Sequence, residues 1–250
     1  MERKLATVIM AAGKGTRMKN SEKAKVMFEV CEIPMIEHVV RLAYDIHSSR
    51  VVVIVGFKRE SVIEHVTKVA PLVEYAVQEP QLGTGHAIMQ TEALLGSYDG
   101  DVLVLSGDVP LLQEKTIEDM ISHHHASEAA ATILTADVDD PTGYGRVLRN
   151  GNGYVEAIVE HRDATPEQLA VKEINSGIYI FNAKMLYDAL HHIDAHNAQN
   201  EYYLTDVFGY FWKHTMPVSA VKAVDHNEIR GINTIDQLVE AESVLVARGQ

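Results

Sequence analysis

The sequence predicts an α/β fold, in which a mixed but mostly parallel sheet has helices on both faces. Residues 5–12, 51–55 and 101–106 are mainly apolar runs, and each is followed by a glycine. Runs of this length and composition are typical of strands that are buried on both faces. Segments in which apolar residues recur with helical spacing separate the runs. Strands that alternate with helices in this way indicate a Rossmann-like arrangement.

The remaining elements of the first half follow the same alternation. In residues 34–47 the apolar side chains recur three or four positions apart, which is the spacing of one helix face. The same reasoning predicts helices over residues 59–69, 85–95 and 114–126. Residues 73–77 are predicted to form a short strand before the strand at 101–106.

After residue 126 the pattern changes, because short strands follow one another more closely. Two of them, at 144–149 and 154–159, surround the sequence Asn-Gly-Asn-Gly at 150–153. Asn-Gly pairs favour tight turns, so we expect these two strands to form a hairpin. The other predicted elements are strands at 129–136, 178–181 and 218–224 and helices at 183–192, 205–214 and 234–248.

Composition limits the functions that the chain can serve. Of its 250 residues 46% are apolar, which is enough for a substantial core. The chain has 35 acidic and 22 basic side chains, which give a formal net charge of −13. Nucleic-acid binding needs a basic surface, so we expect no nucleic-acid partner. A small polyanion would instead need a local pocket with cations, backbone N–H groups and a metal.

Neither cysteine usage nor hydropathy indicates secretion or a membrane. Cys31 is the only cysteine, so an intrachain disulfide is impossible. The apolar run that follows residues 1–4 is too short for a signal sequence. No stretch reaches the roughly 20 apolar residues of a membrane span. We therefore expect a cytoplasmic protein without a membrane partner.

The loop after the first predicted strand is rich in small residues. It reads AAGKGTRM from Ala11 to Met18, and small residues let a backbone approach a ligand closely. Exposed N–H groups in such a loop can cradle phosphate, and Arg17 can bind phosphate oxygens with two parallel hydrogen bonds. Lys14 and Lys25 add positive charge to the same region. A tight turn between strand and helix is the alternative interpretation, but Arg17 and Lys25 together favour phosphate binding.

Two common nucleotide-binding motifs do not fit this loop. A dinucleotide fingerprint requires a glycine three residues after Gly15, where this sequence has Met18. A Walker A loop requires Gly-Lys followed by Ser or Thr at its end, and that ending is absent. A dehydrogenase is therefore the least favoured class of enzyme.

A carboxylate and an amide follow two other predicted strands. Asp108 comes after the strand at 101–106 and a glycine, so it should lie at the edge where open α/β sheets bind ligands. A carboxylate there suits Mg²⁺, although a turn residue before a proline is the alternative interpretation. Gln78 follows the strand at 73–77, and its amide can both donate to and accept from a base. A surface glutamine is the alternative.

These motifs belong to a longer series. The loop AAGKGTRM, with a lysine seven or eight residues later, resembles the signature of sugar-phosphate nucleotidyltransferases. The chain is similar in particular to the uridyltransferase domain of bifunctional N-acetylglucosamine-1-phosphate uridyltransferases. The similarity covers nearly the whole chain, in the same order, through QLGTGHA (81–87), SGDVPLL (106–112), DDPTGYGRV (139–147), IVEHRDAT (158–165), EINSGIY (173–179), NAQNEYYLTD (197–206) and GIN (231–233).

The resemblance implies one domain, 1–250, of the nucleotide-diphospho-sugar transferase type. Its nucleotide-binding half would be 1–126 and its sugar-phosphate-binding half 127–250. The implied reaction transfers a uridylyl group from UTP to a sugar 1-phosphate, in particular N-acetylglucosamine 1-phosphate, with Mg²⁺ as cofactor. The oligomeric state stays open. The alternatives are a cytidylyl- or guanylyltransferase with another sugar 1-phosphate, and a non-catalytic module that senses nucleotide sugars.

The resemblance also assigns roles to individual residues. The catalytic residues would be Arg17, Lys25 and Asp108. The metal ligands would be Asp108 and Asn233, although Asn233 could also cap the helix at 234–248. The residues that hold the sugar phosphate would be Gly145, Glu160, Asn175 and Asn233. The residues that hold the nucleotide would be Met10, Ala11, Ala12, Gly13, Lys25, Gln78, Gly83, Thr84, Ser106 and Asp108.

The sequence departs from the family pattern at several places. Ala24 stands where the family usually has a proline before the catalytic lysine, and the segment 19–24 is one residue longer. Ser106 stands where a tyrosine is common. The β-helix that carries the family's acetyltransferase has no counterpart here, so we expect only the first activity. Three consecutive histidines, 123–125, are expected to be a solvated helix end and not a metal site.

Overall fold

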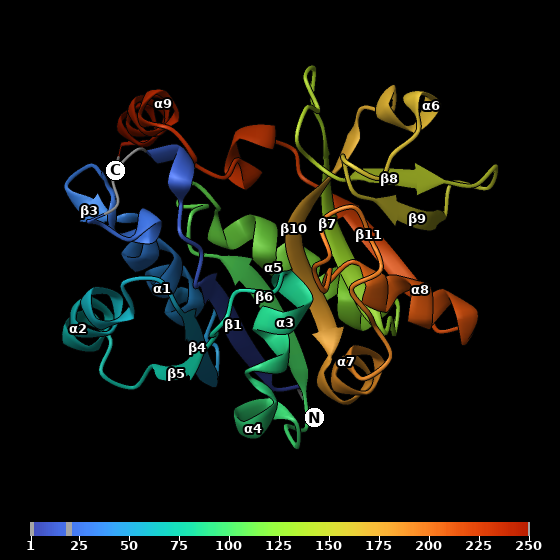
Figure 1. Ribbon diagram of the computed structural model, residues 1–250, viewed down its shortest axis with the longest axis horizontal. Helices are drawn as coiled ribbons and strands as arrows, with labels where there is room; N and C mark the ends of the chain where they lie inside the picture. The colour runs from blue at the N-terminus through green and yellow to red at the C-terminus, as the bar shows by residue number, and fades with distance from the viewer. Residues whose placement is uncertain (1–2, 19–21, 250) are drawn as a thin grey trace.

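The computed structural model describes residues 3–18 and 22–249, and one large sheet forms its centre (Figure 1). In the described residues, seven strands follow the order β11-β7-β10-β6-β1-β4-β5, and the β8–β9 hairpin joins this sheet at β10. The strands are β1 (Leu5–Ala11), β4 (Arg50–Val55), β5 (Glu74–Val77), β6 (Asp101–Ser106), β7 (Ala131–Asp137), β8 (Arg146–Arg149), β9 (Val155–Val159), β10 (Glu173–Asn182) and β11 (Val218–Lys222). A separate small sheet contains β2 (Glu29–Val30) and β3 (Ile33–Pro34).

The apolar runs of the sequence form the middle of the large sheet. β1 is parallel to β4 on one side and to β6 on the other. Val8 of β1 stands opposite Val52 and Val104 in these two pairs, and all three side chains are fully buried. Because helices cover both faces, neither face of these strands needs polar residues. The predicted mixed, mostly parallel α/β fold is confirmed.

Helices form one layer on each face of the sheet (Figure 1). α1, α2 and α5 share an apolar cluster with Ile9 and Leu103, whereas α3, α4, α7 and α8 share the opposite cluster with Val8 and Val104. Within residues 3–18 and 22–249, no helix is both long and apolar enough to cross a membrane. The helices are α1 (Met35–Asp45), α2 (Arg59–Val69), α3 (Thr84–Met89), α4 (Glu92–Leu95), α5 (Glu114–Ala126), α6 (Pro166–Leu169), α7 (Ala183–Leu190), α8 (Asp206–Lys213) and α9 (Ile235–Ala247), with short 3-10 turns at η1 (Thr16–Met18), η2 (Lys25–Met27) and η3 (His226–Ile229).

Residues 85–95 form two helices and not the single helix that the sequence predicts. α3 ends at Met89 and α4 begins at Glu92, with the fully buried Thr91 between them. The Thr91 hydroxyl donates to the carbonyl oxygen of Ile88 at 2.6 Å, and a hydroxyl that binds a backbone carbonyl competes with a continuing helix. Thr91 Oγ1 also lies 2.7 Å from the hydroxyl of Tyr187. A tertiary contact therefore stabilises the break.

The prediction of a solvated histidine cluster at the end of α5 is wrong. His124 is fully buried, and its Nδ1 lies 2.7 Å from Thr132 Oγ1 on β7. His125 Nε2 lies 3.0 Å from a carboxylate oxygen of the fully buried Asp101, so only His123 is exposed. Consecutive helix residues point about 100° apart, so three neighbours cover more than half of the helix circumference, and here the middle one faces the sheet.

β10 is longer than predicted and is antiparallel to both of its neighbours, β6 and β7. The sequence predicts a strand only over its apolar part, 178–181. The first part of β10 carries polar residues that are buried because they are paired. Glu173 accepts a hydrogen bond from Thr135 Oγ1 at 2.8 Å and two from the Arg149 guanidinium at 2.6 and 2.8 Å. Paired polar residues in a strand give no hydrophobic signal in the sequence.

A buried carboxylate fixes the loop that precedes α9. Glu228 in η3 is 3% exposed. Its Oε2 accepts from Thr116 Oγ1 at 2.6 Å and from the Gln113 N–H at 3.3 Å, and its Oε1 accepts from Gln113 Nε2 at 2.7 Å. A little further along, the Ile232 N–H donates to the carbonyl oxygen of Asp108 at 2.9 Å. These bonds hold the loop against the start of α5 and the segment after β6.

Replacement of Glu228 by alanine is expected to lower the free energy of unfolding by about 2 kcal/mol, because it removes the buried acceptor of three hydrogen bonds donated by Thr116 and Gln113. Urea denaturation followed by circular dichroism measures this change. Glu240→Ala is the control, since the Glu240 side chain is 58% exposed and pairs with Arg230 at the surface. We expect a loss below about 1 kcal/mol for the control. Equal losses in the two variants would contradict the role given to Glu228.

Candidate active site

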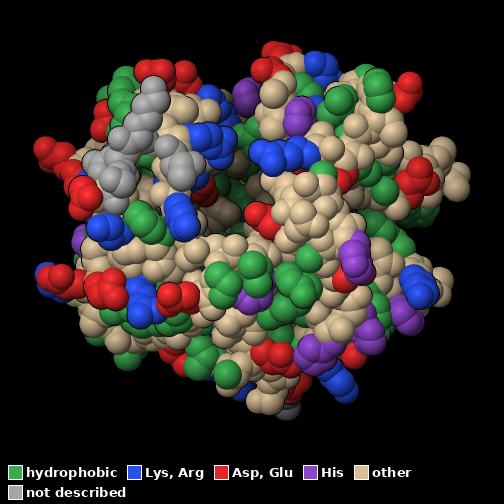
Figure 2. Space-filling view, in the orientation of Figure 1, with side chains coloured by type: hydrophobic (Ala, Val, Ile, Leu, Met, Phe, Trp, Pro, Cys, Tyr) green, Lys and Arg blue, Asp and Glu red, His purple; other side chains and the backbone are tan. Residues whose placement is uncertain are grey.

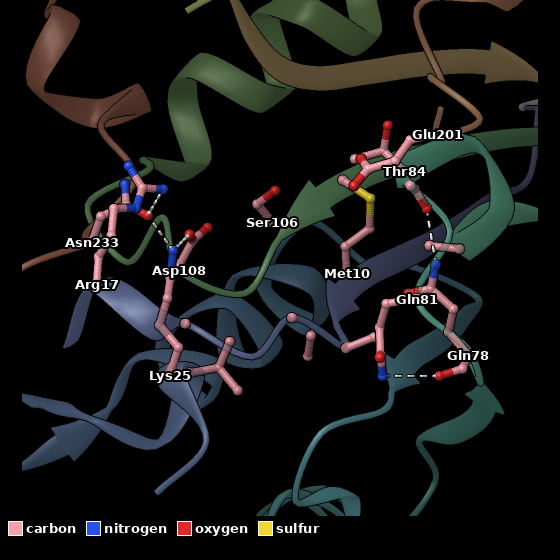
Figure 3. A pocket seen from close by; sticks show the side chains of 17 residues that line it. Met10, Arg17, Lys25, Gln78, Gln81, Thr84, Ser106, Asp108, Glu201 and Asn233 are labelled. Atoms are coloured by element: carbon pink, nitrogen blue, oxygen red, sulfur yellow. Dashed lines mark hydrogen bonds and ion pairs between the residues drawn. The ribbon is translucent and has the colours of Figure 1, made fainter. Parts of the chain in front are cut away.

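A pocket of about 390 Å³ lies at the carboxyl ends of β1, β5 and β6 (Figure 3). The space-filling view shows a hollow bordered by Lys and Arg side chains above the central strands (Figure 2). All ten residues predicted to hold the nucleotide line the pocket, together with Arg17 and Asn233. The complete lining is Met10, Ala11, Ala12, Gly13, Gly15, Arg17, Lys25, Val26, Gln78, Gln81, Gly83, Thr84, Ala87, Ser106, Asp108, Glu201 and Asn233.

The glycine loop after β1 brings a lysine from the next segment over the pocket. Gly15 has φ +58°, which lies in the left-handed region that favours glycine. A Cβ atom at this position would also collide with the Cβ of Lys25. Gly13, by contrast, faces open space on its side-chain side, which leaves its backbone accessible to a ligand. The loop therefore needs its glycines both for its own conformation and to let η2 pack against it.

Lys25, Asp108, Asn233 and Arg17 converge at one end of the pocket (Figure 3). Lys25 Nζ donates to Asn233 Oδ1 at 2.6 Å and forms an ion pair with Asp108 Oδ2. Arg17 Nη2 donates to the same Asn233 Oδ1 at 2.7 Å. Two cations and two oxygen acceptors from four separate parts of the chain thus surround one point. The Lys25 and Asp108 side chains are only 14% and 20% exposed, which strengthens their mutual attraction.

The orientation of the Asn233 amide is fixed by its own neighbours. Its Nδ2 donates to the carbonyl oxygen of Gly231 at 3.0 Å, so Oδ1 is the atom that faces the two cations. Its backbone N–H donates to Gln237 Oε1 at 2.7 Å. Thr234, and not Asn233, is the N-cap of α9. The alternative of a helix-capping role for Asn233 is therefore not supported.

Ala24 adopts the conformation that a proline would impose. Its φ is −62° and its ψ is 140°, and a proline ring holds φ near −65°. Ala24 is buried, and the lysine that follows reaches Asp108 and Asn233 without a proline before it. The segment 19–24 is expected to be one residue longer than in the family, and its residues 19–21 lie outside the described residues.

The other end of the pocket contains the amide of Gln78. Gln78 is buried at the end of β5, and its Nε2 donates to the carbonyl oxygen of Gly83 at 2.9 Å. The segment after Gly83 is in turn tied to a distant part of the chain, because the Gly85 N–H donates to the carbonyl oxygen of Tyr202 at 2.8 Å. This pairing brings Glu201 to the pocket. The surface position considered for Gln78 is therefore wrong.

Sequence reasoning missed two polar residues of the pocket, Gln81 and Glu201. Both lie in strings that resemble the family, at 81–87 and 197–206, so their position in those strings was the available signal. Hydropathy could not single them out. Glu201 reaches the pocket only through the pairing of residues that are more than a hundred positions apart.

Gly145, Glu160 and Asn175 form a second cluster, which does not line the first pocket. The Asn175 N–H donates to the carbonyl oxygen of Gly145 at 2.9 Å. A Cβ on Gly145 would lie 3.5 Å from Glu160 Oε2, so glycine leaves room beside this carboxylate. Burial raises the pKa of Glu160, and a 3.1 Å hydrogen bond from Thr205 Oγ1 partly offsets that rise. Thr205 is the N-cap residue before α8, but its hydroxyl donates to Glu160 and makes no capping hydrogen bond.

This combination of fold and site defines a class of protein that handles nucleotide phosphates. A glycine loop follows the first strand, a carboxylate follows a neighbouring strand, and cations converge between them. The sequence profile of the nucleotidyl transferase family matches residues 6–242. The chain belongs to the nucleotidyl transferase family, and the family resemblance inferred from its motifs is confirmed.

Two curated relatives are bifunctional proteins of the same name. The chain is 48% identical over 244 residues to the bifunctional protein GlmU of Acetivibrio thermocellus, which covers 98% of this chain and 52% of that protein. It is 47% identical over 245 residues to the bifunctional protein GlmU of Streptomyces coelicolor, with 97% of this chain and 51% of that protein covered. The chain thus spans about half the length of these relatives.

A solved structure gives independent support for the fold. A UDP-glucose pyrophosphorylase complexed with UDP-glucose superposes with a TM-score of 0.76 and 17% sequence identity. The match covers 98% of this chain and 99% of the other. At this level of identity the likeness concerns the fold alone.

Proposed function

We propose that this chain transfers a uridylyl group from UTP to N-acetylglucosamine 1-phosphate and releases pyrophosphate. The observation that carries the proposal is the 48% identity to GlmU over 98% of the chain. The convergence of Lys25, Asp108 and Asn233 supports it, because a non-catalytic sensing module would not need this charged cluster.

The proposed chemistry is an in-line substitution at phosphorus. A phosphate oxygen of the sugar 1-phosphate forms a bond to the α-phosphorus of UTP, and the bond from that phosphorus to the bridging oxygen of pyrophosphate breaks. The substrate provides the nucleophile, so the protein supplies position and charge. Arg17 and Lys25 lie within hydrogen-bond distance of the same atom, Asn233 Oδ1, so both can reach one group of phosphate oxygens.

We propose Asp108 and Asn233 as ligands of Mg²⁺. Asp108 Oδ2 and Asn233 Oδ1 contact the same ammonium of Lys25, so the two oxygens are placed to share one cation. Among the described residues no group of three or more His, Cys, Asp or Glu side chains could hold a metal, so phosphate oxygens and water would complete the shell. When bound, Mg²⁺ would neutralise phosphate charge.

Gln78 supports uridine as the nucleoside. Its Nε2 is engaged by the Gly83 carbonyl, and this bond fixes the plane of the amide. The amide oxygen is then an acceptor for a ligand N–H. The N3 atom of uracil carries a hydrogen, whereas N3 of cytosine is an acceptor, so an amide oxygen directed at N3 distinguishes the two bases.

Glu160, Asn175 and Gly145 are the proposed sugar site. A carboxylate accepts hydrogen bonds from sugar hydroxyls, and an amide both donates and accepts. Partial burial of Glu160, which raises its pKa, strengthens such bonds because less water competes for the carboxylate.

Pyrophosphate release measured across nucleoside triphosphates and sugar 1-phosphates tests the proposed function. We expect turnover of UTP with N-acetylglucosamine 1-phosphate that depends on Mg²⁺ and stops with EDTA. Equal turnover of CTP would favour a cytidylyltransferase. The absence of release with every pair, although nucleotide sugars bind, would favour a sensing module and refute the proposal.

A further inference from the structure

A bulge in β10 places a buried tyrosine beside Asn175. Asn175 pairs with Thr135 on β7, and Tyr179 pairs with Ile133, so four steps along β10 correspond to two along β7. Gly177 lies within this bulge at φ +79°. The bulge accommodates the two extra residues of β10, so Asn175 and Tyr179 become near neighbours on one face of the sheet. Asn175 Nδ2 donates to the hydroxyl oxygen of Tyr179 at 2.6 Å.

The bulge also determines which end of the Asn175 amide faces which partner. The Gly177 N–H donates to Asn175 Oδ1 at 3.3 Å. A backbone N–H can only donate, so Oδ1 must lie on this side and Nδ2 must face Tyr179. The amide keeps a second N–H, and Oδ1 keeps a second lone pair. A Cβ on Gly145 would lie 3.5 Å both from the Asn175 Cβ and from Glu160 Oε2, so Asn175 and Glu160 flank the same glycine.

Tyr179 is rigid and keeps its proton. Its side chain is 3% exposed, and its ring centroid lies 5.5 Å from those of both Phe181 and Phe208. Burial and the negative charge of Glu160 raise the pKa of the Tyr179 phenol, so it stays neutral across the physiological range. A phenol held by two aromatic neighbours fixes the position of any group bonded to it.

We propose that Tyr179 is a positioning residue for the sugar 1-phosphate, which it orients indirectly by fixing the amide of Asn175. This inference rests on the sugar-binding role of Asn175 in the proposed function. Tyr179 itself does not line the nucleotide pocket. Without its hydroxyl, the amide loses the partner of its Nδ2 and can rotate away from the sugar.

Tyr179→Phe removes one oxygen and leaves the ring in place. We expect the KM for N-acetylglucosamine 1-phosphate to rise about tenfold, the effect of one lost hydrogen bond. The kcat and the KM for UTP should change by less than about twofold, because uniform binding of one substrate affects its KM alone. Calorimetric titration with UDP-N-acetylglucosamine should give a parallel rise in Kd.

Tyr187→Phe is the matched control. Tyr187 is also 3% exposed and belongs to the same apolar cluster, and its hydroxyl lies 2.7 Å from Thr91 Oγ1, outside the sugar cluster. Tyr187→Phe also removes the oxygen of a buried phenol, so it should lower the free energy of unfolding by a similar amount. The KM for the sugar 1-phosphate should stay unchanged. A rise in sugar KM of the same size in both variants would overturn the proposal, because it would mean a general loss of packing.

A double-mutant cycle tests whether Tyr179 affects sugar binding through Asn175 or independently of it. In an Asn175→Ala background, Tyr179→Phe should add less than about a twofold change in sugar KM. If the two substitutions instead raise the sugar KM by factors that multiply, Tyr179 acts independently of Asn175 and its positioning role is overturned. If Asn175→Ala raises the sugar KM and Tyr179→Phe does not, the inference about Tyr179 fails and the proposed function stands. If Asn175→Ala leaves the sugar KM at its wild-type value, the sugar-binding role of Asn175 fails, and with it this inference.

Discussion

Asp108→Asn is expected to lower kcat on the order of 1,000-fold while the protein keeps its fold. The substitution keeps the shape of the side chain but removes the negative charge opposite Lys25 and Arg17. The proposed metal site then has two amides and no carboxylate, and a hard cation binds such a site weakly. The contact between the Asp108 carbonyl oxygen and the Ile232 N–H uses only the backbone, so the loop before α9 should stay in place.

Rates measured at several Mg²⁺ concentrations check this prediction, with thermal unfolding by circular dichroism as the test of fold. Asp119→Asn is the control, because Asp119 lies on α5 in an exposed ion pair with Lys115. The control should turn over as the wild type does. A wild-type rate for Asp108→Asn at limiting Mg²⁺ would remove Asp108 from the metal site.

Lys25→Ala is expected to lower kcat by about 100-fold or more, the size of effect produced by other preorganised electrostatic groups. The ammonium lies at the point where Asp108 and Asn233 converge, and it is proposed to stabilise charge that shifts on the phosphates during transfer. The KM for UTP should change less than kcat. Steady-state kinetics in both substrates measure the two effects separately.

Two further variants test the prediction for Lys25. Lys23→Ala is the control, since Lys23 precedes the site by two residues and pairs with the exposed Glu29. Glu160→Ala should show the opposite kinetic signature, with a higher KM for the sugar 1-phosphate and little change in kcat. If Lys25→Ala leaves kcat unchanged and Glu160→Ala weakens UTP binding, the assignment of the two ends of the site is wrong.

The first pocket could be predicted from the sequence because strand ends locate it. Each buried parallel strand is a readable apolar run, and ligand-binding residues follow such runs at one edge of the sheet. Asp108 and Gln78 were found in this way, and both line the pocket. Asn233 follows no predicted strand, and only the family resemblance indicated it. Its position near Asp108 depends on the hydrogen bonds of Glu228 and Ile232, which no local pattern reveals.

What sequence reasoning missed is polar and buried. Glu173, His124 and Tyr179 are each hydrogen-bonded to a partner that is distant in sequence or brought near by a bulge. Their burial contradicts what hydropathy predicts for polar residues, so the start of β10 and the packing of the histidines were not predicted. The short helix α6 lies between β9 and β10, and its local signals are the capping box at Thr165 and Gln168 and the proline at its first position.

The position of β10 has a consequence for ligand design. This strand carries Asn175 and is hydrogen-bonded to β6, the strand that leads to Asp108. The proposed nucleotide and sugar sites are therefore connected by the backbone of a single sheet, so we expect their separation to vary little. A bisubstrate inhibitor that joins a uridine mimic to a sugar mimic would meet a fixed span. A stiff linker of matching length should bind more tightly than a flexible one, because little conformational entropy is left to lose.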